Sequence, residues 1–213
     1  VQELYSSGDL DGIVALGGSM GTSLGITVMK ALPLTMPKLM VSTVAFTPLI
    51  PPDAVSKDLT IMPTVVDLWG LNRMTKRVLE NAAGAIMGMV ESYEYEKGDM
   101  PQKPLVGITT IGTASCKYVL WAKPLLEEMG YEVVVFHTNS IGGGTFEQFV
   151  EQGLLDGALD LSIFELVNSL CGGMLGVENR LDALAKSEIP QVITPGVLWF
   201  AGGPAESLPP RFQ

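Results

Sequence analysis

The sequence has few of the residues that build metal centres and disulfide frameworks. Its 213 residues include two cysteines, Cys116 and Cys171, and one histidine, His137. The cysteines lie far apart and form no CxxC pair, which argues against a structural zinc site or a disulfide scaffold and fits a reducing compartment. We therefore expect a cytoplasmic protein without a dedicated metal centre. We also expect both thiols to be small buried side chains.

Basic charge and long apolar runs are also scarce. The 13 Lys and Arg residues stand against 23 Asp and Glu residues, so the formal net charge is −10. A protein that binds nucleic acid neutralises the phosphates with clustered basic side chains, and this acidic chain has few of them. The longest apolar stretches, such as 12–16 and 38–44, have the length of strands and fall far short of the roughly 20 residues that span a bilayer. We expect neither nucleic acid nor a membrane as a partner.

Short Val- and Ile-rich runs alternate with helix-length amphipathic stretches, a pattern typical of parallel βαβ units. We predict an α/β protein of two Rossmann-like open parallel-sheet units. The charged, weakly patterned segment 94–104 separates them, so the units are 1–98 and 99–213. The predicted strands lie near 12–16, 38–44, 104–109, 132–137, 157–161 and 190–194, and the predicted helices near 19–32, 70–96, 115–129, 146–152, 165–170 and 180–186.

An internal repeat supports this organisation. Residues 8–12 (GDLDG) match residues 153–157 (GLLDG) at an offset of 153 − 8 = 145. We predict that the strands that follow are equivalent, each in the interior of its own sheet. The second unit has a strand–helix–strand block before its copy, whereas the first has only the end of a helix. We expect the first sheet to lack its opening strands, which a missing segment or another chain would supply, and we expect a homo-oligomer.

A glycine-rich turn, LGGSMGT at 16–22, joins the first predicted strand to a helix. Glycines let backbone N–H groups approach a ligand closely, and the N-terminus of a helix attracts anions. The turn has neither the GxxxxGK[ST] nor the GxGxxG pattern. We predict that it binds the phosphates of a nucleotide or another small anion; the alternative is a plain turn with a serine N-cap. The predicted ligand-binding residues here are Gly17, Gly18, Ser19, Gly21 and Thr22.

Two further pairs of residues are predicted to join this site. Ser42 and Thr43 end the next strand, at the edge where open parallel sheets bind ligands. Asn72 and Arg73 open the long helix and would help to neutralise phosphate in an acidic protein. The alternative for this helix start is a solvated face with Arg–Glu pairing.

The same turn also has the G-x-S-x-G spacing of a hydrolase nucleophile elbow, with Ser19 at its centre. A catalytic triad would need His137 as the base, with Asp67 between them in the sequence. Because His137 ends a strand of the other unit, with further strands after it, we treat a serine hydrolase as an alternative. A second alternative is a module that binds a small acid or a sugar between the two units.

The second unit has a polar rim of its own. Segments 109–113 and 137–145 follow two predicted strands, and Glu165 follows a third. All three lie at the carboxyl ends of strands, so we predict that they converge on one crevice. The triple glycine 142–144 belongs to this rim or acts as a hinge. No catalytic residue is predicted.

Five ordered motifs carry a resemblance to a known family: residues 17–22, 41–45, 71–73, 81–85 and 136–143. Together they resemble the ATP-binding, tomato mosaic virus resistance protein-like family, long catalogued as uncharacterised. The resemblance covers essentially the whole chain. It implies two Rossmann-like domains and a nucleotide, ATP, at the 17–22 turn. The family's opening strand with its Gly-Thr-x-Asp-Thr-Lys motif and its C-terminal part are not found in this sequence.

An enzymatic version of this nucleotide-binding function would also need magnesium. Magnesium bound beside phosphates takes carboxylate oxygens as ligands. The candidates for this role are Asp58 and Asp67. The partners we expect are therefore a nucleotide or small anionic ligand, with ATP and magnesium as cofactors.

Overall fold

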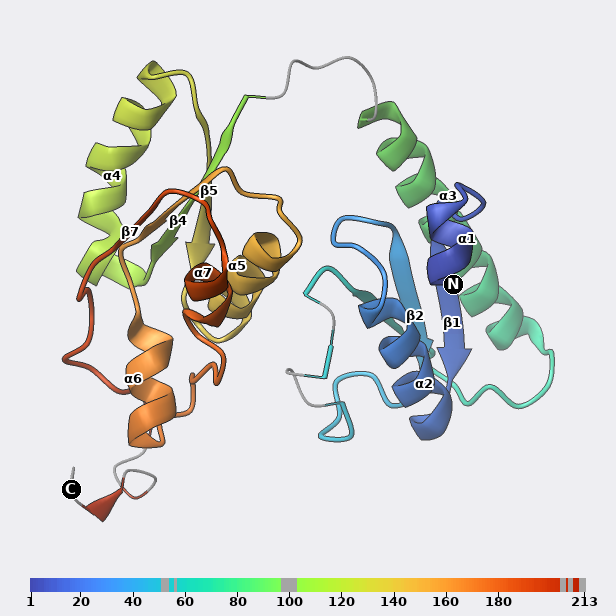
Figure 1. Ribbon diagram of the computed structural model, residues 1–213. Helices are drawn as coiled ribbons and strands as arrows, with labels where there is room; N and C mark the ends of the chain where they lie inside the picture. Colours follow the sequence, from blue (N-terminus) through green and yellow to red (C-terminus); the bar gives the residue numbers. More distant parts are fainter. Residues whose placement is uncertain (51–53, 56, 97–102, 204–205, 207–208, 211–213) are drawn as a thin grey trace. The chain divides into compact units, whose positions relative to one another are not determined.

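A computed structural model of the protein describes residues 1–50, 54, 55, 57–96, 103–203, 206, 209 and 210. The chain forms two compact units, Val1–Met100 and Pro101–Gln213. Each unit has one parallel sheet with helices packed on it (Figure 1). The predicted α/β fold of two Rossmann-like parallel-sheet units is therefore confirmed. Within the described part of the chain, no helix is long and apolar enough to cross a membrane.

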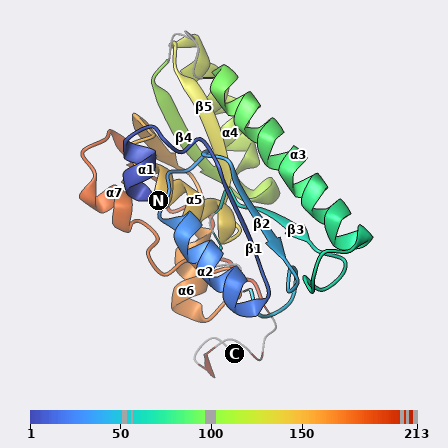
Figure 2. The same ribbon diagram turned by 90° about the vertical axis from the view of Figure 1, so that its right-hand side faces the viewer.

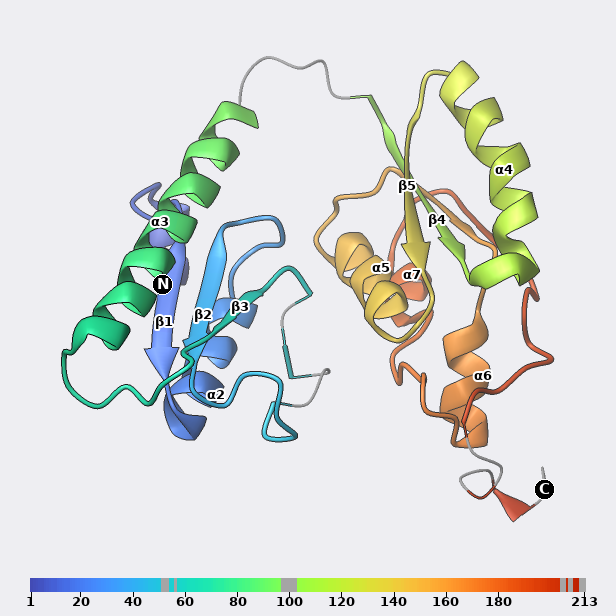
Figure 3. The ribbon, with the colours of Figure 1, turned by 180° about the vertical axis from the view of Figure 1, so that it is seen from behind.

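The first unit has three parallel strands in the order β1-β2-β3. Strand β2 is buried along its whole length because both of its faces are covered: Leu39 and Val41 pack on α3, and Met40 packs on α2. Figures 2 and 3 show these two helices on opposite sides of the sheet. The elements are α1 (Gln2–Ser6), β1 (Ile13–Gly17), α2 (Ser19–Lys30), β2 (Lys38–Ser42), β3 (Thr60–Pro63) and α3 (Arg73–Glu96).

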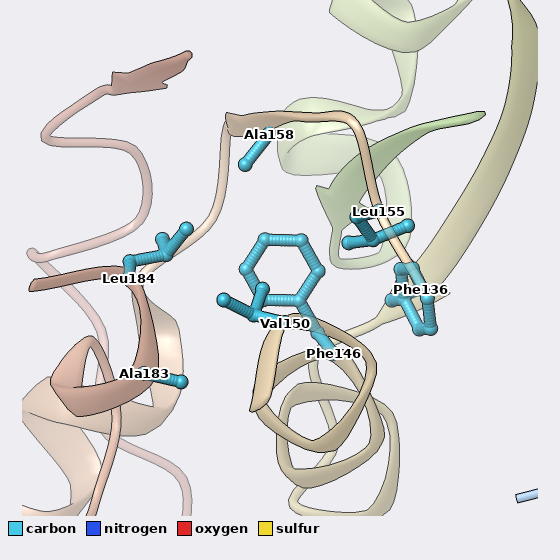
Figure 4. Packing of buried hydrophobic residues seen from close by; sticks show 7 residues of the cluster. All are labelled: Phe136, Phe146, Val150, Leu155, Ala158, Ala183 and Leu184. Atoms are coloured by element: carbon cyan, nitrogen blue, oxygen red, sulfur yellow. The ribbon is translucent and has the colours of Figure 1, made fainter. Parts of the chain in front are cut away.

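The second unit has four parallel strands in the order β5-β4-β6-β7. Helices α5 and α7 cover one face of this sheet. Phe146 of α5 lies at the centre of the hydrophobic core that these helices form with the strands (Figure 4). Its ring packs edge-on against Phe136 of β5, with ring centroids 5.4 Å apart. The elements are β4 (Leu105–Thr110), α4 (Gly112–Glu128), β5 (Glu132–His137), α5 (Ile141–Glu151), β6 (Gly157–Asp160), α6 (Phe164–Cys171), α7 (Asp182–Lys186) and β7 (Gln191–Ile193).

The internal repeat has the same local geometry in both units. Gly8 follows α1 with φ 78° and Gly153 follows α5 with φ 66°, left-handed conformations that favour glycine after a helix. The residue after each glycine donates its N–H to the carbonyl five residues earlier, at 2.9 Å in both copies. Ile13 and Ala158, again 145 positions apart, each donate an N–H at 2.9 Å to the proline carbonyl before the neighbouring strand. These shared hydrogen bonds favour a duplication.

The two equivalent strands differ in position. β6 lies in the interior of its sheet, between β4 and β7, but β1 lies at an edge and pairs only with β2 among the described strands. The prediction of an interior position is therefore wrong for β1. The physical reason is that β4, which covers the corresponding edge of β6, has no counterpart among the described residues of the first unit.

We expect the isolated chain to self-associate through this edge. The unpaired N–H and C=O groups of β1 can accept another strand, and Val14 and Leu16 are 42% and 46% exposed. Multi-angle light scattering should give a mass above that of one chain at tens of micromolar protein. Replacing both side chains with lysine should return the mass to that of a monomer. A monomer in the unmodified chain would contradict this expectation.

Candidate functional site

The glycines of the 17–22 turn have two different roles. A Cβ at Gly17 would lie 2.6 Å from the Cα of Gly21, so the end of β1 can pass the first turn of α2 only without a side chain. A Cβ at Gly18 would meet only the hydroxyl oxygen of Thr43, at 3.5 Å. Gly18 is exposed, has φ −80° and ψ −156°, and is the N-cap of α2. The fold requires Gly17, but it leaves open space beside Gly18.

The start of α2 is free to accept an anion. The first N–H groups of a helix have no acceptor within the helix, and no side chain caps α2. The helix begins at Ser19, so the alternative in which this serine is the N-cap is wrong. Ser19 is exposed and its side chain has no hydrogen bond among the described residues. A ligand at this turn would meet backbone N–H groups and one hydroxyl.

Thr22 and Ser42 hold this turn in place. Both are buried, and their hydroxyl oxygens lie 2.7 Å apart. Thr22 also donates to the carbonyl of Gly17 at 3.3 Å, and the Ser42 hydroxyl accepts the N–H of Val44 at 3.1 Å. These contacts join the first turn of α2 to the end of β2, so both hydroxyls position the turn.

A cleft of about 460 Å³ lies at the carboxyl ends of β2 and β3, beside this turn. Ser42 at the end of β2 and Thr43 just after it line one side, and Asp67 lines the cleft from the segment after β3. Val65, also in the lining, has φ 63° and is 81% exposed. A β-branched residue rarely adopts this conformation, and the 2.6 Å hydrogen bond from the N–H of Val66 to the carbonyl of Thr64 makes it the centre of a γ-turn. Strained loops of this kind concentrate at binding sites.

Asn72 and Arg73 do not line the cleft. Asn72 is the N-cap of α3: its side-chain oxygen accepts the N–H groups of Met74 and Thr75 at 2.9 and 3.1 Å. Arg73 is exposed and has no ion pair among the described residues. The expected Arg–Glu pairing does occur on this helix, between Arg77 and Glu80 at 3.5 Å, and both of those side chains are exposed.

Asp58 and Asp67 are separated by the sheet of the first unit. Asp58 binds the buried ammonium group of Lys38 at 2.5 Å, and Lys38 begins β2. Asp58 is therefore at the amino edge, opposite the 17–22 turn, and only Asp67 fits a magnesium ion beside that turn. The hydrolase alternative has less support, because Ser19 has an ordinary backbone conformation and not the strained one of a nucleophile elbow. The only histidine of the chain, His137, belongs to the second unit.

In the second unit, one buried arginine binds three buried carboxylates. Arg180 donates to Glu147 at 2.8 Å, to Glu165 at 3.0 Å and to both oxygens of Asp160 at 2.9 and 2.7 Å. The guanidinium also lies 5.3 Å from the centre of the Phe146 ring. The network joins α5, α6, β6 and the segment before α7. We name it the Arg180 cluster: Arg180, Glu147, Asp160 and Glu165.

The predicted polar rim of the second unit is largely occupied by its own side chains. The Glu165 carboxylate accepts the N–H groups of Ser140 and Gly143 at 2.7 and 3.0 Å, so it fills the anion position at the start of α5. A Cβ at Gly143 would overlap that carboxylate, and one at Gly142 would overlap the carbonyl of His137. The glycines therefore allow this close packing. Thr109, from the other rim segment, donates to Asp160.

The Arg180 cluster has more negative than positive charge. Burial raises the pKa of Glu165, and the nearby Arg180 guanidinium and the two backbone N–H groups offset only part of this effect. Only Glu165 of this cluster was singled out from the sequence. The partners of Arg180 lie 15, 20 and 33 positions away from it, and these separations follow no helix or strand period.

The raised pKa of Glu165 predicts a pH-dependent stability. An unfolded chain protonates this carboxyl only near its ordinary pKa, whereas the folded chain already protonates it at higher pH. The folded state therefore binds more protons in that interval, and its free energy of unfolding falls as the pH rises through it. We expect the unmodified protein to gain stability relative to Glu165→Gln as the pH falls from neutral toward the ordinary pKa of a glutamate, about 4.3. Urea unfolding of both proteins at several pH values measures the difference between their free energies of unfolding. A difference that does not change with pH would contradict the prediction.

The two cysteines lie in different environments. Cys116 is exposed and Cys171 is half-buried, so the expectation of two buried thiols is wrong. Cys116 lies on the solvent side of α4, a position that a hydropathy pattern does not reveal. Within the described ranges, no group of three or more His, Cys, Asp or Glu side chains is arranged to hold a metal ion.

Comparison with known proteins identifies the family. Residues 1–95 match the N-terminal domain of the uncharacterised protein family UPF0261, and residues 103–213 match its C-terminal domain. The chain belongs to the UPF0261 family. Among UPF0261 relatives, a protein of Clostridium tetani is 40% identical over 216 residues, and one of Brucella suis is 35% identical over 215. Both alignments cover 100% of this chain and 52% and 51% of the relatives, so the chain spans about half their length.

A plant relative extends the comparison. The ToMV resistance protein Tm-1(GCR237) of Solanum lycopersicum is 37% identical over 212 residues, which cover 96% of this chain and 28% of the tomato protein. The predicted resemblance to a tomato mosaic virus resistance protein-like family is thus confirmed at the level of sequence relationship.

Proposed function

We propose that this UPF0261 chain is a cytoplasmic nucleotide-binding protein that takes ATP, with the phosphates at the 17–22 turn. The observation that carries the proposal is the contrast between Gly17 and Gly18. Packing of the fold accounts for the first glycine, but it does not account for the second. An exposed, uncapped helix start with open space beside it is a favourable place for phosphate.

Each neighbouring group has a part in this proposal. Backbone N–H groups at the start of α2 donate to the phosphates, and the hydroxyls of Ser19 and Thr43 add neutral donors. Thr22 and Ser42 position the turn through their 2.7 Å contact. Arg73, exposed at the start of α3, supplies positive charge near the same edge of the sheet. The cleft of about 460 Å³ beyond Thr43 takes the rest of the nucleotide.

Magnesium, when bound with the nucleotide, would neutralise part of the phosphate charge. Asp67 is the carboxylate in the cleft lining that would hold it. The residues present fit a nucleotide bound mainly through backbone groups and one metal ligand. We propose binding and assign no reaction.

Isothermal titration calorimetry of the 213-residue chain with ATP, in the presence and absence of magnesium, tests the proposal. We expect saturable binding with one site per chain, weakened by removal of magnesium. Inorganic triphosphate should compete, because the phosphates make the backbone contacts. Failure of both ATP and triphosphate to bind a folded chain would contradict the proposal.

A further inference from the structure

The second unit has a cleft of about 370 Å³ that the Arg180 cluster does not fill. The first two turns of α4 form one side of it through Ala114, Ser115 and Tyr118. Leu161, which follows β6, and residues 194–197 and 199, which follow β7, form the remainder. The cleft is therefore built from three segments that all follow strands at the carboxyl edge of the sheet.

This cleft lies beside the point where the chain changes direction across the sheet. From β4 the chain passes through α4 to β5 on one side, and it later returns to β6 on the other side of β4. Open parallel sheets bind ligands at this switch point, outside the carboxyl ends of the two central strands. Helix α5, which also starts at this edge, already has the Glu165 carboxylate at its N-terminus. The start of α4 has no side-chain cap.

The wall of the cleft after β7 is tightly fitted to β6. A Cβ at Gly196 would overlap the carbonyl of Leu161, so the segment can approach only with a glycine there. The carbonyl of Gly196 accepts the N–H of Ile163 at 3.3 Å. Val197 is buried and has φ 63°. These contacts fix the path of the backbone at Gly196 and Val197, just before Trp199.

The mouth of the cleft has two exposed aromatic rings. Trp199 is 79% exposed and Tyr118 is 55% exposed. No charged side chain belongs to the lining formed by the described residues. Large exposed aromatics beside an apolar hollow favour a flat ring, which gains both buried area and ring–ring contacts. An acidic group on such a ring would meet the backbone N–H groups at the start of α4, near Ala114.

We propose that this cleft binds a small planar aromatic acid, with its ring against Trp199 and Tyr118 and its acidic group at the first turn of α4. The site is separate from the nucleotide proposal, since all of its residues belong to the second unit. Its two recognition elements, ring and charge, can be tested independently with matched probes.

Fluorine NMR of the full chain labelled with 5-fluorotryptophan tests the site directly. The sequence has three tryptophans, and Trp69, Trp121 and Trp199 are all exposed, so each should give one signal. Trp121 is on α4 but outside the cleft lining, which makes it a matched internal control. We expect 2-naphthoate to shift the Trp199 signal in a saturable way, with a dissociation constant below about 10 mM. Its neutral amide, 2-naphthamide, and the non-aromatic acid cyclohexanecarboxylate should each bind at least about fivefold more weakly.

Variants separate the ring contact from the charge contact. Tyr118→Ala should weaken 2-naphthoate binding roughly five- to tenfold, whereas Trp121→Ala should leave it unchanged. Ala114→Glu should weaken the acid at least about fivefold relative to Ala114→Gln, and a glutamate in the first turn favours the helix, so folding is preserved. Equal binding of acid and amide, or equal shifts at all three tryptophans, would overturn the assignment. So would the absence of any Trp199 shift in the folded protein.

Discussion

Replacing Arg180 with methionine should lower the free energy of unfolding of the second unit by about 3–5 kcal/mol, a large part of the roughly 5–15 kcal/mol typical of a domain. The side chain is 3% exposed and is the positive partner of three buried carboxylates. Methionine fills most of its volume, so the loss comes from the uncompensated charges of the three acids. Urea unfolding followed by circular dichroism gives the free energy directly.

Two controls identify buried charge as the cause. Arg77→Met breaks the exposed pair with Glu80 and should cost less than about 1 kcal/mol. Combining Arg180→Met with the amide variants Glu147→Gln, Asp160→Asn and Glu165→Gln should recover part of the lost stability, because the unpaired charges are gone. If Arg180→Met is no more destabilising than Arg77→Met, the cluster has little structural importance.

Most of the fold could be predicted because parallel strands covered on both faces are continuously apolar. The buried run of β2 and the Val-rich run of β5 gave unambiguous strands. β3 was missed, because its four residues include Met62 and Pro63 and lie between a charged segment and a turn. The edge position of β1 was also missed, since neighbours in a sheet are set by pairing between distant segments and not by local pattern.

The candidate sites were predictable only in part. Glycine at a strand-to-helix turn is visible in a sequence, so the 17–22 turn could be found. The distinction between Gly17, which packing requires, and Gly18, which it does not, depends on the path of α2 in three dimensions. The occupation of the α5 start by Glu165 could not be foreseen, because that contact joins residues 22 and 25 positions apart.

Gly18→Val should reduce ATP affinity at least about 100-fold while leaving the first unit folded. The valine Cβ would have one neighbour, the Thr43 hydroxyl at 3.5 Å, and the backbone at Gly18 is extended with a negative φ, so no left-handed strain opposes a side chain there. Its two methyl groups would occupy the space in which phosphate must meet the N–H groups of α2. Several charge-assisted hydrogen bonds are lost together, each worth about 1.5–3 kcal/mol.

Two variants make this result specific when all are titrated with ATP by calorimetry. Ser19→Ala removes one neutral hydroxyl and should weaken binding only about three- to tenfold. Gly84→Val places the same side chain on the exposed side of α3, where a Cβ meets nothing within 4 Å, and should leave affinity unchanged. If Ser19→Ala loses more ATP affinity than Gly18→Val does, a direct chemical role for the serine would be favoured. Full ATP affinity in a folded Gly18→Val protein would remove the turn from the phosphate site, because no phosphate could approach α2 past that side chain.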